Sequence, residues 1–203
     1  LVDIGGGTTD LAVWTQGAIR HTSVIPIAGD QITNDIAMAL RTPTREAEDI
    51  KCKFGCALAD LADPEDVIDV AGVDDRPSRK LSRRALADVI QPRVEELFEL
   101  VQAELRRSGF DQVLSSGIVL TGGSAVMCGM AELAEDVFHM PARVGAPQYD
   151  GGLADVVCQP RYSTAMGLVM EGAAQRRRGL QARDTRSVKQ VFGRMKAWFE
   201  RNF

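Results

Sequence analysis

Residues 1–10 read LVDIGGGTTD, an apolar run followed by three consecutive glycines that stand between two carboxylates. The apolar run predicts a buried strand, and the glycines predict a tight loop because they carry no Cβ atoms. Such a loop can bring backbone N–H groups close to an anion, and Thr8 and Thr9 add hydroxyl donors. Asp3, at the end of the strand, can hold a magnesium ion directly or through water. Taken alone, however, these residues fit a plain glycine-rich hairpin with Asp3 as a turn residue better than a phosphate site.

A second glycine loop late in the chain changes that balance. Residues 119–130, VLTGGSAVMCGM, repeat the order strand, threonine and paired glycines, and Gly122 and Gly123 leave the backbone free to lie flat against a nucleoside. Neither loop carries the GKT/S of a Walker loop or the GxGxxG of a dinucleotide fold. A helix expected after Thr44 places Glu48 and Lys51 on one face. Two glycine loops, this helix and one carboxylate for a metal together predict a nucleotide clamp.

Apolar periodicity and turn residues predict alternating strands and helices, and therefore an α/β fold. Strands are expected over residues 1–4, 9–15, 18–27, 66–70, 79–82, 117–120 and 142–146, with a turn at Gln16 and Gly17. Helices are expected over residues 28–40, 44–54, 83–109 with a kink at Pro92, 129–138, and 162–170 with Ser163 as the cap.

The composition fits a globular chain. Its 203 residues suffice for one mid-sized domain or two small lobes, and no uncharged apolar run is long enough to span a bilayer. No secretory signal is visible, and Leu1 is expected to lie inside a strand, so we interpret the sequence as the C-terminal part of a longer protein. The four cysteines lack metal-ligand spacing and favour buried, reduced thiols in a cytosolic protein.

The C-terminal tail differs from the rest of the chain in charge. From Arg176 onward it holds nine Lys and Arg residues against two acids, although the net charge of the chain is −4. In the last 17 residues, apolar side chains follow helical spacing: Val188, Val191, Phe192, Met195, Trp198, Phe199 and Phe203. The flanks of this stripe carry Lys189, Arg194, Lys196 and Arg201.

A basic amphipathic helix of about 24 Å can lie in the headgroup plane of an anionic membrane with its aromatic side in the acyl boundary. A helix that packs on its own domain is the commoner fate of such a stripe. The solvated stretch before it, its many aromatic residues and its basic charge favour the membrane. Nucleic acid is a weaker alternative, because aromatic residues on one helical face suit lipid better than bases.

Two segments carry a resemblance to known proteins. DIGGGTTD resembles the second phosphate loop of the actin/DnaK/sugar-kinase ATPase superfamily, and VLTGGSAVMCGM resembles its adenosine loop. More specifically, IAGDQITNDIA, AEDIKCKFGCA, GIVLTGGSAVMCGMAELAEDVF and YSTAMGL resemble the FtsA family of bacterial cell-division proteins, in family order and over essentially the whole chain. The resemblance implies an actin-like, ribonuclease H-like ATPase domain with an inserted α/β subdomain and a C-terminal amphipathic helix. It assigns 1–54 and 118–174 to an inner subdomain, 55–117 to an outer one, 175–186 to a flexible linker and 187–203 to the membrane-targeting helix.

The resemblance also implies roles for the loop residues. Asp3 would organise Mg2+, and Asp10 stands where actin carries a water-polarising histidine. The β- and γ-phosphates of ATP would be contacted by Gly5, Gly6, Gly7, Thr8 and Thr9, with Gly29 on the phosphate side. Glu48 and Lys51 would face the ribose and base, and the adenosine would lie against Gly122, Gly123, Ser124 and Met127. The family's first phosphate loop belongs to its other domain, so this chain would hold half a cleft and bind ATP poorly alone, and the whole protein would bind tightly and hydrolyse slowly.

The resemblance further implies partners. The family recruits the tubulin-like protein FtsZ through the FtsZ C-terminal peptide, which docks on the outer subdomain. Basic residues are available there for an acidic peptide, at Arg79, Arg83, Arg84 and Arg93, although an ordinary solvated helix face explains each of them equally well. Self-association into filaments, other divisome proteins and the cytoplasmic face of the inner membrane at the division septum complete the expected setting.

The function expected on these grounds is an ATP-binding adaptor that anchors FtsZ filaments to the membrane and helps to assemble the divisome. One alternative is an enzyme, either a sugar kinase or a DnaK-type ATPase, but it leaves the tail unexplained and no substrate-side general base is evident. Another alternative is a pilus-assembly protein of similar fold, which would lack the terminal helix.

Overall fold

The structure is a computed structural model that describes residues 1–72, 77–111, 114 and 116–177. The chain divides into two compact units, Leu1–Ser163 and the part that begins at Thr164, and we describe each unit by itself. The predicted helix over 187–203, with all of its membrane-binding candidates, lies outside the described residues, and so does most of the predicted linker.

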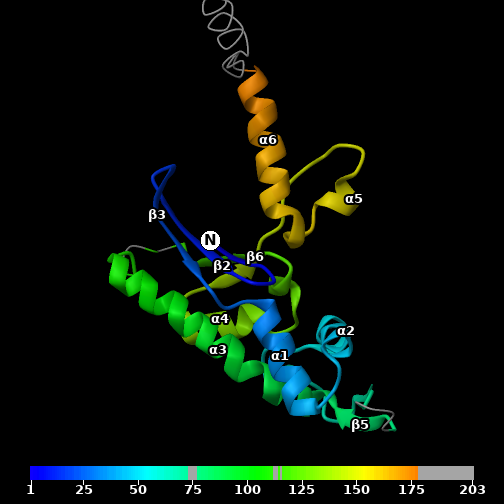
Figure 1. Cartoon of the computed structure of the whole chain (residues 1–203). Coiled ribbons are helices and arrows are strands. Elements are labelled where there is room, and N and C mark those ends of the chain that lie inside the picture. The colour runs from blue at the N-terminus through cyan, green and yellow to red at the C-terminus, as the bar shows by residue number, and fades with distance from the viewer. Residues whose placement is uncertain (73–76, 112–113, 115, 178–203) are drawn as a thin grey trace, which may run out of the picture. The chain divides into compact units, whose positions relative to one another are not determined.

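A five-stranded mixed sheet forms the centre of the first unit (Figure 1). Its strand order is β3-β2-β1-β6-β7, with antiparallel pairs from β3 to β1 and parallel pairs from β1 to β7. The strands are β1 Val2–Ile4, β2 Thr9–Thr15, β3 Ala18–Ile25, β6 Ile118–Thr121 and β7 Ala142–Val144. The structure thus confirms all five strands expected in these segments, with shifts of one or two residues at their ends.

The alternation of side chains explains β2 and β3. Leu11 and Val13 are buried, whereas Asp10 and Trp14 are exposed, as expected for a strand with one face on the core. Gln16 and Gly17 both have positive φ, 53° and 76°, which is the geometry of the two-residue turns that join twisted antiparallel strands. The predicted turn is confirmed.

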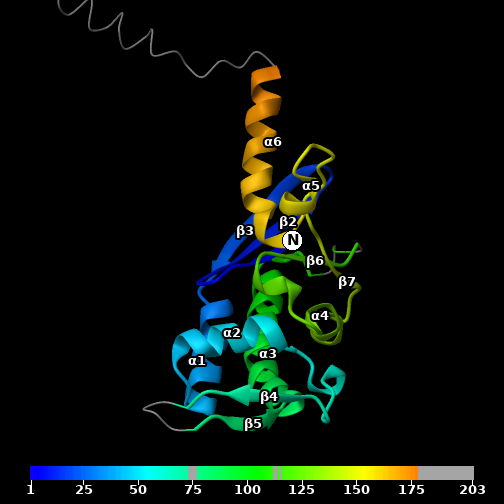
Figure 2. The same ribbon diagram turned by 90° about the vertical axis from the view of Figure 1, so that its right-hand side faces the viewer.

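Helices cover one side of this sheet, where α1, α3 and α4 lie together (Figures 1 and 2). The helices of this unit are α1 Gly29–Leu40, α2 Thr44–Phe54, α3 Arg83–Ser108, α4 Met130–Phe138 and the short α5 Ala154–Val157. The core between sheet and helices includes Ile4, Ile36, Phe98 and Leu120, each fully buried. Each such side chain contributes about 1.5–3 kcal/mol when it leaves water.

The longest helix, α3, begins and ends where the sequence predicts. The hydroxyl of Ser82 accepts a hydrogen bond from the Ala85 N–H at 3.2 Å, and Gly109 follows the helix with a φ of 75°. These two features satisfy backbone groups that the helix itself leaves unpaired. The helix continues through Pro92, so the predicted segment is one helix along its whole length.

Residues 55–117 contribute to the same core. The hairpin of β4 Val67–Val70 and β5 Arg79–Ser82 buries Ile68 and Val70 in a cluster that also contains the apolar face of α3 and the central sheet. The hairpin therefore shares the main apolar core, and a second, small cluster consists of Cys56, Ala59, Ala62 and Ala87. The described residues also form three short 3-10 helices: η1 Ala59–Leu61, η2 Ser124–Val126 and η3 Pro160–Tyr162. Each spans three residues, which is too short for apolar periodicity in the sequence to predict it.

The second unit is represented by α6, Ser163–Arg177, which continues the expected helix past residue 170 and over the first three residues of the expected linker. Ala173, Ala174 and Gln175 favour helix, which explains the extension. Ser163 is the first residue of α6 rather than its cap, and Thr44 likewise begins α2, with Pro43 before it. None of the described helices is both long enough and apolar enough to cross a membrane.

Candidate nucleotide site

The two glycine loops meet because β1 and β6 are adjacent and parallel. Val2 pairs with Leu120 and Asp3 with Thr121, so both strands reach the same edge of the sheet before Gly5 and Gly122. In α/β sheets, ligands bind beyond the carboxyl ends of the strands. Pairing between residues more than 110 positions apart therefore brings the two predicted loops together.

Hydrogen bonds join the first loop to both neighbouring segments. The carbonyl oxygen of Gly5 accepts from the Ser124 hydroxyl at 2.9 Å and from the Gly29 N–H at 3.1 Å. The Gly6 carbonyl oxygen accepts from the Asp30 N–H at 2.8 Å. The loop carbonyls thus face α1 and η2, and they satisfy two of the N–H groups at the start of α1.

The other side of the first loop is open. Gly6, Gly7 and Thr8 are exposed, and the Gly6 and Gly7 amides donate to no backbone carbonyl among the described residues. A Cβ on Gly7 would have ordinary contact at 3.8 Å with Asp30 Oδ2, and a Cβ on Gly123 would meet only Arg161 Cβ at 4.0 Å. Each loop therefore carries a glycine whose position the fold would allow an alanine to occupy.

Gly122 is different, because the fold requires a glycine there. Its φ is +93°, and an added Cβ would lie 2.4 Å from the Ile4 carbonyl oxygen and 2.5 Å from Asp3 Oδ1. This close approach locks the second loop against the end of β1.

The two predicted carboxylates lie on one face of the sheet. Asp3 and Asp10 are directly paired across β1 and β2, and paired residues point to the same side. No group of three His, Cys, Asp or Glu side chains suited to a metal occurs among the described residues. The carboxylates of Asp3 and Asp10 fit Mg2+, which typically takes one or two carboxylates together with phosphate oxygens and waters.

Thr9 does not face the open side of the loop. Its side chain is fully buried, and its hydroxyl donates to the Ile27 carbonyl oxygen at 2.7 Å. The hydroxyl thus holds the hairpin against the segment before α1, and of the two predicted threonines only Thr8 is exposed.

Lys51 is buried beneath the site and joins α1 to α2. Its ammonium group donates to the Gly29 carbonyl oxygen at 3.0 Å and to the Thr33 hydroxyl at 2.8 Å, and it pairs with Glu48 Oε2 at 2.7 Å. These contacts occupy all three N–H donors of the ammonium group. Lys51 therefore positions other groups, and its own charge faces protein.

Glu48 is the most accessible member of this cluster, with 46% of its side chain exposed. Burial acts to raise the pKa of its carboxyl, but hydrogen bonds from Lys51 and Thr33 outweigh burial and hold that pKa below its ordinary value. Glu48 therefore presents a carboxylate beside the glycine loops, where a ribose hydroxyl can donate to it.

Gly29 and Gly55 bring the remaining candidates together. An added Cβ on Gly29 would lie 2.5 Å from Ser124 Oγ and 3.2 Å from both the Gly5 oxygen and Lys51 Nζ. A Cβ on Gly55, at the end of α2, would lie 3.4 Å from Met127 Cγ. The first loop, the second loop and α2 thus converge around α1, which is the arrangement that the predicted clamp requires.

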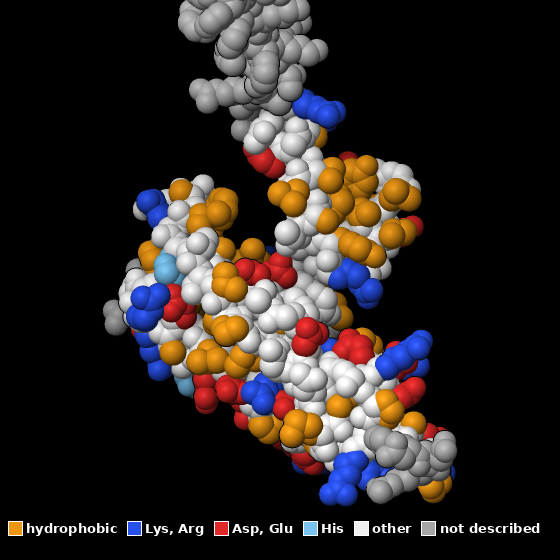
Figure 3. Space-filling model, viewed as in Figure 1, with side chains coloured by type: hydrophobic (Ala, Val, Ile, Leu, Met, Phe, Trp, Pro, Cys, Tyr) orange, Lys and Arg blue, Asp and Glu red, His pale blue; other side chains and the backbone are white. Residues whose placement is uncertain are grey.

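The four predicted partner-binding arginines lie on the same lobe, and each has an acceptor within the chain. Arg79 donates to the Leu40 carbonyl oxygen, Arg83 to that of Phe54, and Arg84 pairs with Asp60 at 2.9 Å. Arg93 forms a two-point ion pair with Asp35 of α1, and this pair raises the pKa of its guanidinium. Figure 3 shows basic and acidic side chains interspersed around β5 rather than a purely basic surface.

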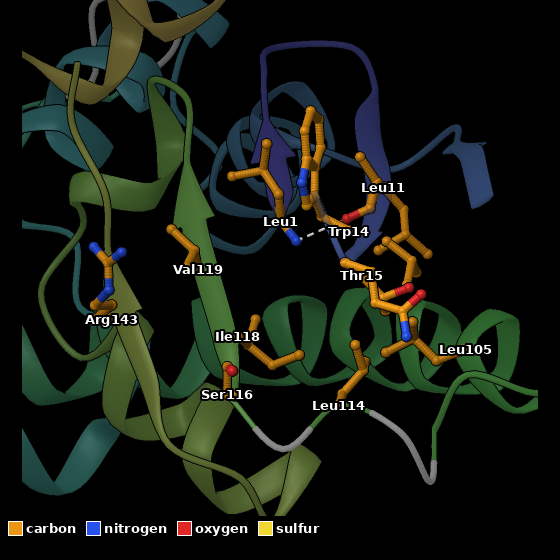
Figure 4. A pocket seen from close by; sticks show the side chains of 14 residues that line it. Leu1, Leu11, Trp14, Thr15, Leu105, Leu114, Ser116, Ile118, Val119 and Arg143 are labelled. Atoms are coloured by element: carbon orange, nitrogen blue, oxygen red, sulfur yellow. Dashed lines mark hydrogen bonds between the residues drawn. The ribbon is translucent and has the colours of Figure 1, made fainter. Parts of the chain in front are cut away.

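A cavity of about 510 Å³ lies at the other end of β1, away from the glycine loops (Figure 4). Leu1, Trp14, Leu114 and Ile118 help to line it. Its lining holds none of the residues of the two glycine loops, so the cavity is separate from the candidate site.

Comparison with known proteins matches the sequence of this chain to a family. The family model described as cell division protein FtsA matches residues 1–167. The chain belongs to the FtsA family. It is 56% identical to the FtsA of Pseudomonas aeruginosa over 210 aligned residues, which cover 100% of the chain and 50% of that relative. It is also 45% identical to FtsA of Escherichia coli strain K12, again over the whole chain and 51% of the relative, so the chain spans about half the length of these FtsA proteins.

Solved structures give the same fold outside the FtsA family. MreB5 of Spiroplasma citri bound to ADP has a TM-score of 0.69 at 20% identity, covering 89% of this chain and 55% of that chain. The PilM-PilN type IV pilus biogenesis complex has a TM-score of 0.59 at 22% identity, covering 84% and 44%. Similarities at this level of identity show that this chain has an actin-like fold. This confirms the predicted fold class for the described residues.

Sequence reasoning missed two residues of the candidate site. Thr33 bridges Gly29, Glu48 and Lys51, and the carboxylate of Asp30 lies beside Gly6 and Gly7. Thr33 follows Gly29 by four residues on α1, so helical spacing indicates that the two share a face. Asp30 adjoins a predicted site glycine, but only the tertiary structure shows that it lies against the first loop.

Proposed function

We propose that the protein to which this chain belongs is an actin-like, ATP-binding cell-division protein that attaches FtsZ filaments to the cytoplasmic face of the inner membrane. Membership of the FtsA family and the actin-like fold support this proposal. MreB5, a protein of the same fold, has been solved bound to ADP and to AMPPNP. The protein acts chiefly as an adaptor in this proposal, and any ATP hydrolysis is slow.

One observation carries the nucleotide part of the proposal: both glycine loops and α2 converge on Gly29. The open amides of Gly6 and Gly7 suit phosphate oxygens, because N–H groups aimed into a concavity bind anions. Gly123 lies open in the second loop, where an adenosine can pack against the backbone. Asp3 would hold Mg2+ beside the phosphates, and the ion would neutralise phosphate charge. Asp10, paired with Asp3 across β1 and β2, would face the attacking water.

Titration of MgATP into the full-length protein tests this part. The Gly123→Ala variant should bind at least about tenfold more weakly, a loss of about 1.4 kcal/mol, because its methyl group occupies the open face of the loop. Gly152→Ala is the control, since no atom lies within 4 Å of a Cβ added there and its φ is outside the left-handed region. Equal affinity of the Gly123→Ala variant and the parent would remove the support for an adenosine in this loop.

The membrane part of the proposal rests on the tail, which is outside the described residues. The apolar stripe from Val188 to Phe203 and its basic flanks would place an amphipathic helix on anionic lipid. A filament of such proteins would gain avidity from many weak anchors. Co-sedimentation of the full-length protein with anionic vesicles should fall sharply after combined Trp198→Glu and Phe199→Glu substitution. Unchanged sedimentation would contradict membrane anchoring by this helix.

The FtsZ part of the proposal places the FtsZ C-terminal peptide on the lobe that carries Arg79, Arg83, Arg84 and Arg93. Arg84 is the arginine best suited to a direct contact, because its side chain is 47% exposed and its partner Asp60 is 82% exposed. Arg93 acts differently, since its ion pair with Asp35 joins α3 to α1. Replacing Arg84 with Glu should weaken peptide binding without a change in Tm, as measured by fluorescence anisotropy.

A further inference from the structure

Cys56 and Cys128 are neighbours in space although 72 positions separate them in the sequence. They form an isolated parallel β-bridge, and the Ala57 N–H donates to the Cys128 carbonyl oxygen at 2.7 Å. Paired residues of neighbouring strands lie about 4.8 Å apart, within the 4.4–6.8 Å between Cα atoms that disulfides span. The pairing of the two backbones is therefore compatible with the Cα spacing of a disulfide.

The side chains also face a common region. A Cβ on Gly129, the residue after Cys128, would lie 3.5 Å from Cys56 Sγ. Burial raises the pKa of the Cys56 thiol, and interaction with the neighbouring Cys128 thiol raises it further, although a backbone hydrogen bond at Leu58 acts in the opposite direction. Both observations place the Cys56 sulfur beside Cys128.

The two thiols differ in access. Cys56 is fully buried, whereas Cys128 is exposed at the start of the segment that leads into α4. The expectation that the cysteines are buried therefore holds for Cys56, while Cys128 and Cys52 are exposed and Cys158 is intermediate. An exposed thiol above a buried one is suited to stepwise oxidation from solvent.

We propose that Cys56 and Cys128 form a dithiol site that a low-molecular-weight disulfide such as oxidised glutathione converts to an intramolecular disulfide. The Cys128 thiolate attacks one glutathione sulfur, so that a Cys128–glutathione disulfide forms and one glutathione thiolate leaves. The Cys56 thiolate then attacks the Cys128 sulfur and displaces the second glutathione. The pair of protein thiols loses two electrons and two protons, and one oxidised glutathione becomes two reduced glutathione molecules.

The position of this pair indicates what oxidation would change. Gly55 ends α2, and Met127 is the last residue of the second glycine loop that we assign to the candidate site. A disulfide one residue beyond each of them would fix α2 to that loop. The chemistry of the dithiol site does not depend on the proposed function, and only this consequence rests on it.

Mass spectrometry of the full-length protein carrying Cys52→Ser and Cys158→Ser tests the proposal, because this variant removes the other two cysteines of residues 1–203. After native incubation with oxidised glutathione, free thiols are alkylated and the protein is digested with trypsin without reduction. We expect the peptide that contains Cys56 to be cross-linked to the peptide that contains Cys128, with an intact mass lower by two hydrogens. The Tm should rise by several degrees and return after dithiothreitol, because the bond closes a long loop of the unfolded chain.

Two further variants separate the steps. In the same background, Cys56→Ala should stop at a stable glutathione adduct on Cys128, and Cys128→Ala should react far more slowly because only the buried thiol remains. A lasting adduct on Cys128 with Cys56 still free would overturn the proposal. The proposal would also be overturned if the Cys128→Ala variant reacted with oxidised glutathione as fast as the variant that keeps both cysteines, because Cys128 would then not be the first thiol to react.

Discussion

The two glycine loops of the candidate site use their glycines for different reasons. In the second loop, Gly122 has a positive φ and sits against the Ile4 carbonyl oxygen, so the fold itself requires a glycine. In the first loop, Gly7 is exposed, has no backbone strain, and leaves room for a methyl group. Motifs that look alike in the sequence thus contain one glycine that supports packing and one that keeps a surface open.

The same contrast runs through the neighbouring side chains. Thr9 and Lys51 are buried, and each donates a hydrogen bond to a backbone carbonyl oxygen of another segment. Thr8, in contrast, is exposed, and Glu48 is partly exposed. We therefore expect substitutions on the packed side to lower stability and substitutions on the open side to lower ligand affinity. The following variants test that division.

Gly122→Ala should have the largest effect. Its methyl group would overlap the Ile4 oxygen, and its φ of +93° is unfavourable for alanine, so we expect a loss of about 3 kcal/mol or more in the free energy of unfolding. Thermal denaturation should show a fall in Tm of roughly 10 °C. Gly17→Ala is the control, since Gly17 has a φ of +76° and no atom within 4 Å of an added Cβ. Equal losses in the two variants would mean that the contact with β1 is unimportant.

Lys51→Met should lower the free energy of unfolding by about 2 kcal/mol, because Gly29, Thr33 and Glu48 would lose a charged donor. Lys53→Met, an exposed position on the same helix, should change it by less than about 0.5 kcal/mol. Urea denaturation of both variants makes the comparison. Similar values would contradict a structural role for the Lys51 ammonium group.

Thr9→Val should cost about 1 kcal/mol, since the Ile27 carbonyl oxygen would lose its hydrogen bond. Thr8→Val should leave stability unchanged, because Thr8 is exposed. Chemical denaturation of this pair compares adjacent threonines on the two sides of the loop. A larger loss from Thr8→Val would reverse the assignment of the two side chains.

The smallest effect concerns a carboxyl outside both loops, and its contribution to stability is lost in acid. Hydrogen bonds from Arg107 and His21 lower the pKa of Glu104 to about 2. A carboxyl with a depressed pKa stabilises the fold above its unfolded pKa of about 4.5 and loses that contribution as the pH falls toward 2. Between pH 4.5 and 2, the Tm of the parent should therefore fall more steeply than that of Glu104→Gln. Parallel curves would show that the Glu104 contacts do not contribute.

The sequence predicts local structure well here because periodicity and turn residues are local. The β2–β3 hairpin follows from alternating side chains and Gln16-Gly17, and α3 follows from its apolar stripe between Ser82 and Gly109. The likeness of the two loops led to the prediction of a nucleotide clamp, and the parallel pairing of β1 with β6 brings the two loops to the same edge of the sheet.

The remaining features depend on contacts between segments that are far apart in the sequence, and local sequence patterns do not predict such contacts. The burial of Thr9 and Lys51 depends on Ile27 and Gly29, which come from other segments. The meeting of Cys56 with Cys128 depends on how the end of α2 passes the second loop. Residue types and spacing therefore suggest a nucleotide clamp, but they do not distinguish the side chains that build it from those that face its ligand.

Calorimetric titration of MgATP into the full-length protein and its Gly7→Ala variant tests this account most directly. We predict that the unliganded variant keeps the parent Tm within about 1 °C, because a Cβ at Gly7 meets nothing closer than 3.8 Å. We also predict that its affinity for MgATP falls at least about tenfold, because the methyl group would occupy the place of a phosphate oxygen. Unchanged affinity, or a loss of affinity matched by a large fall in Tm, would contradict the division between a packed side and an open side.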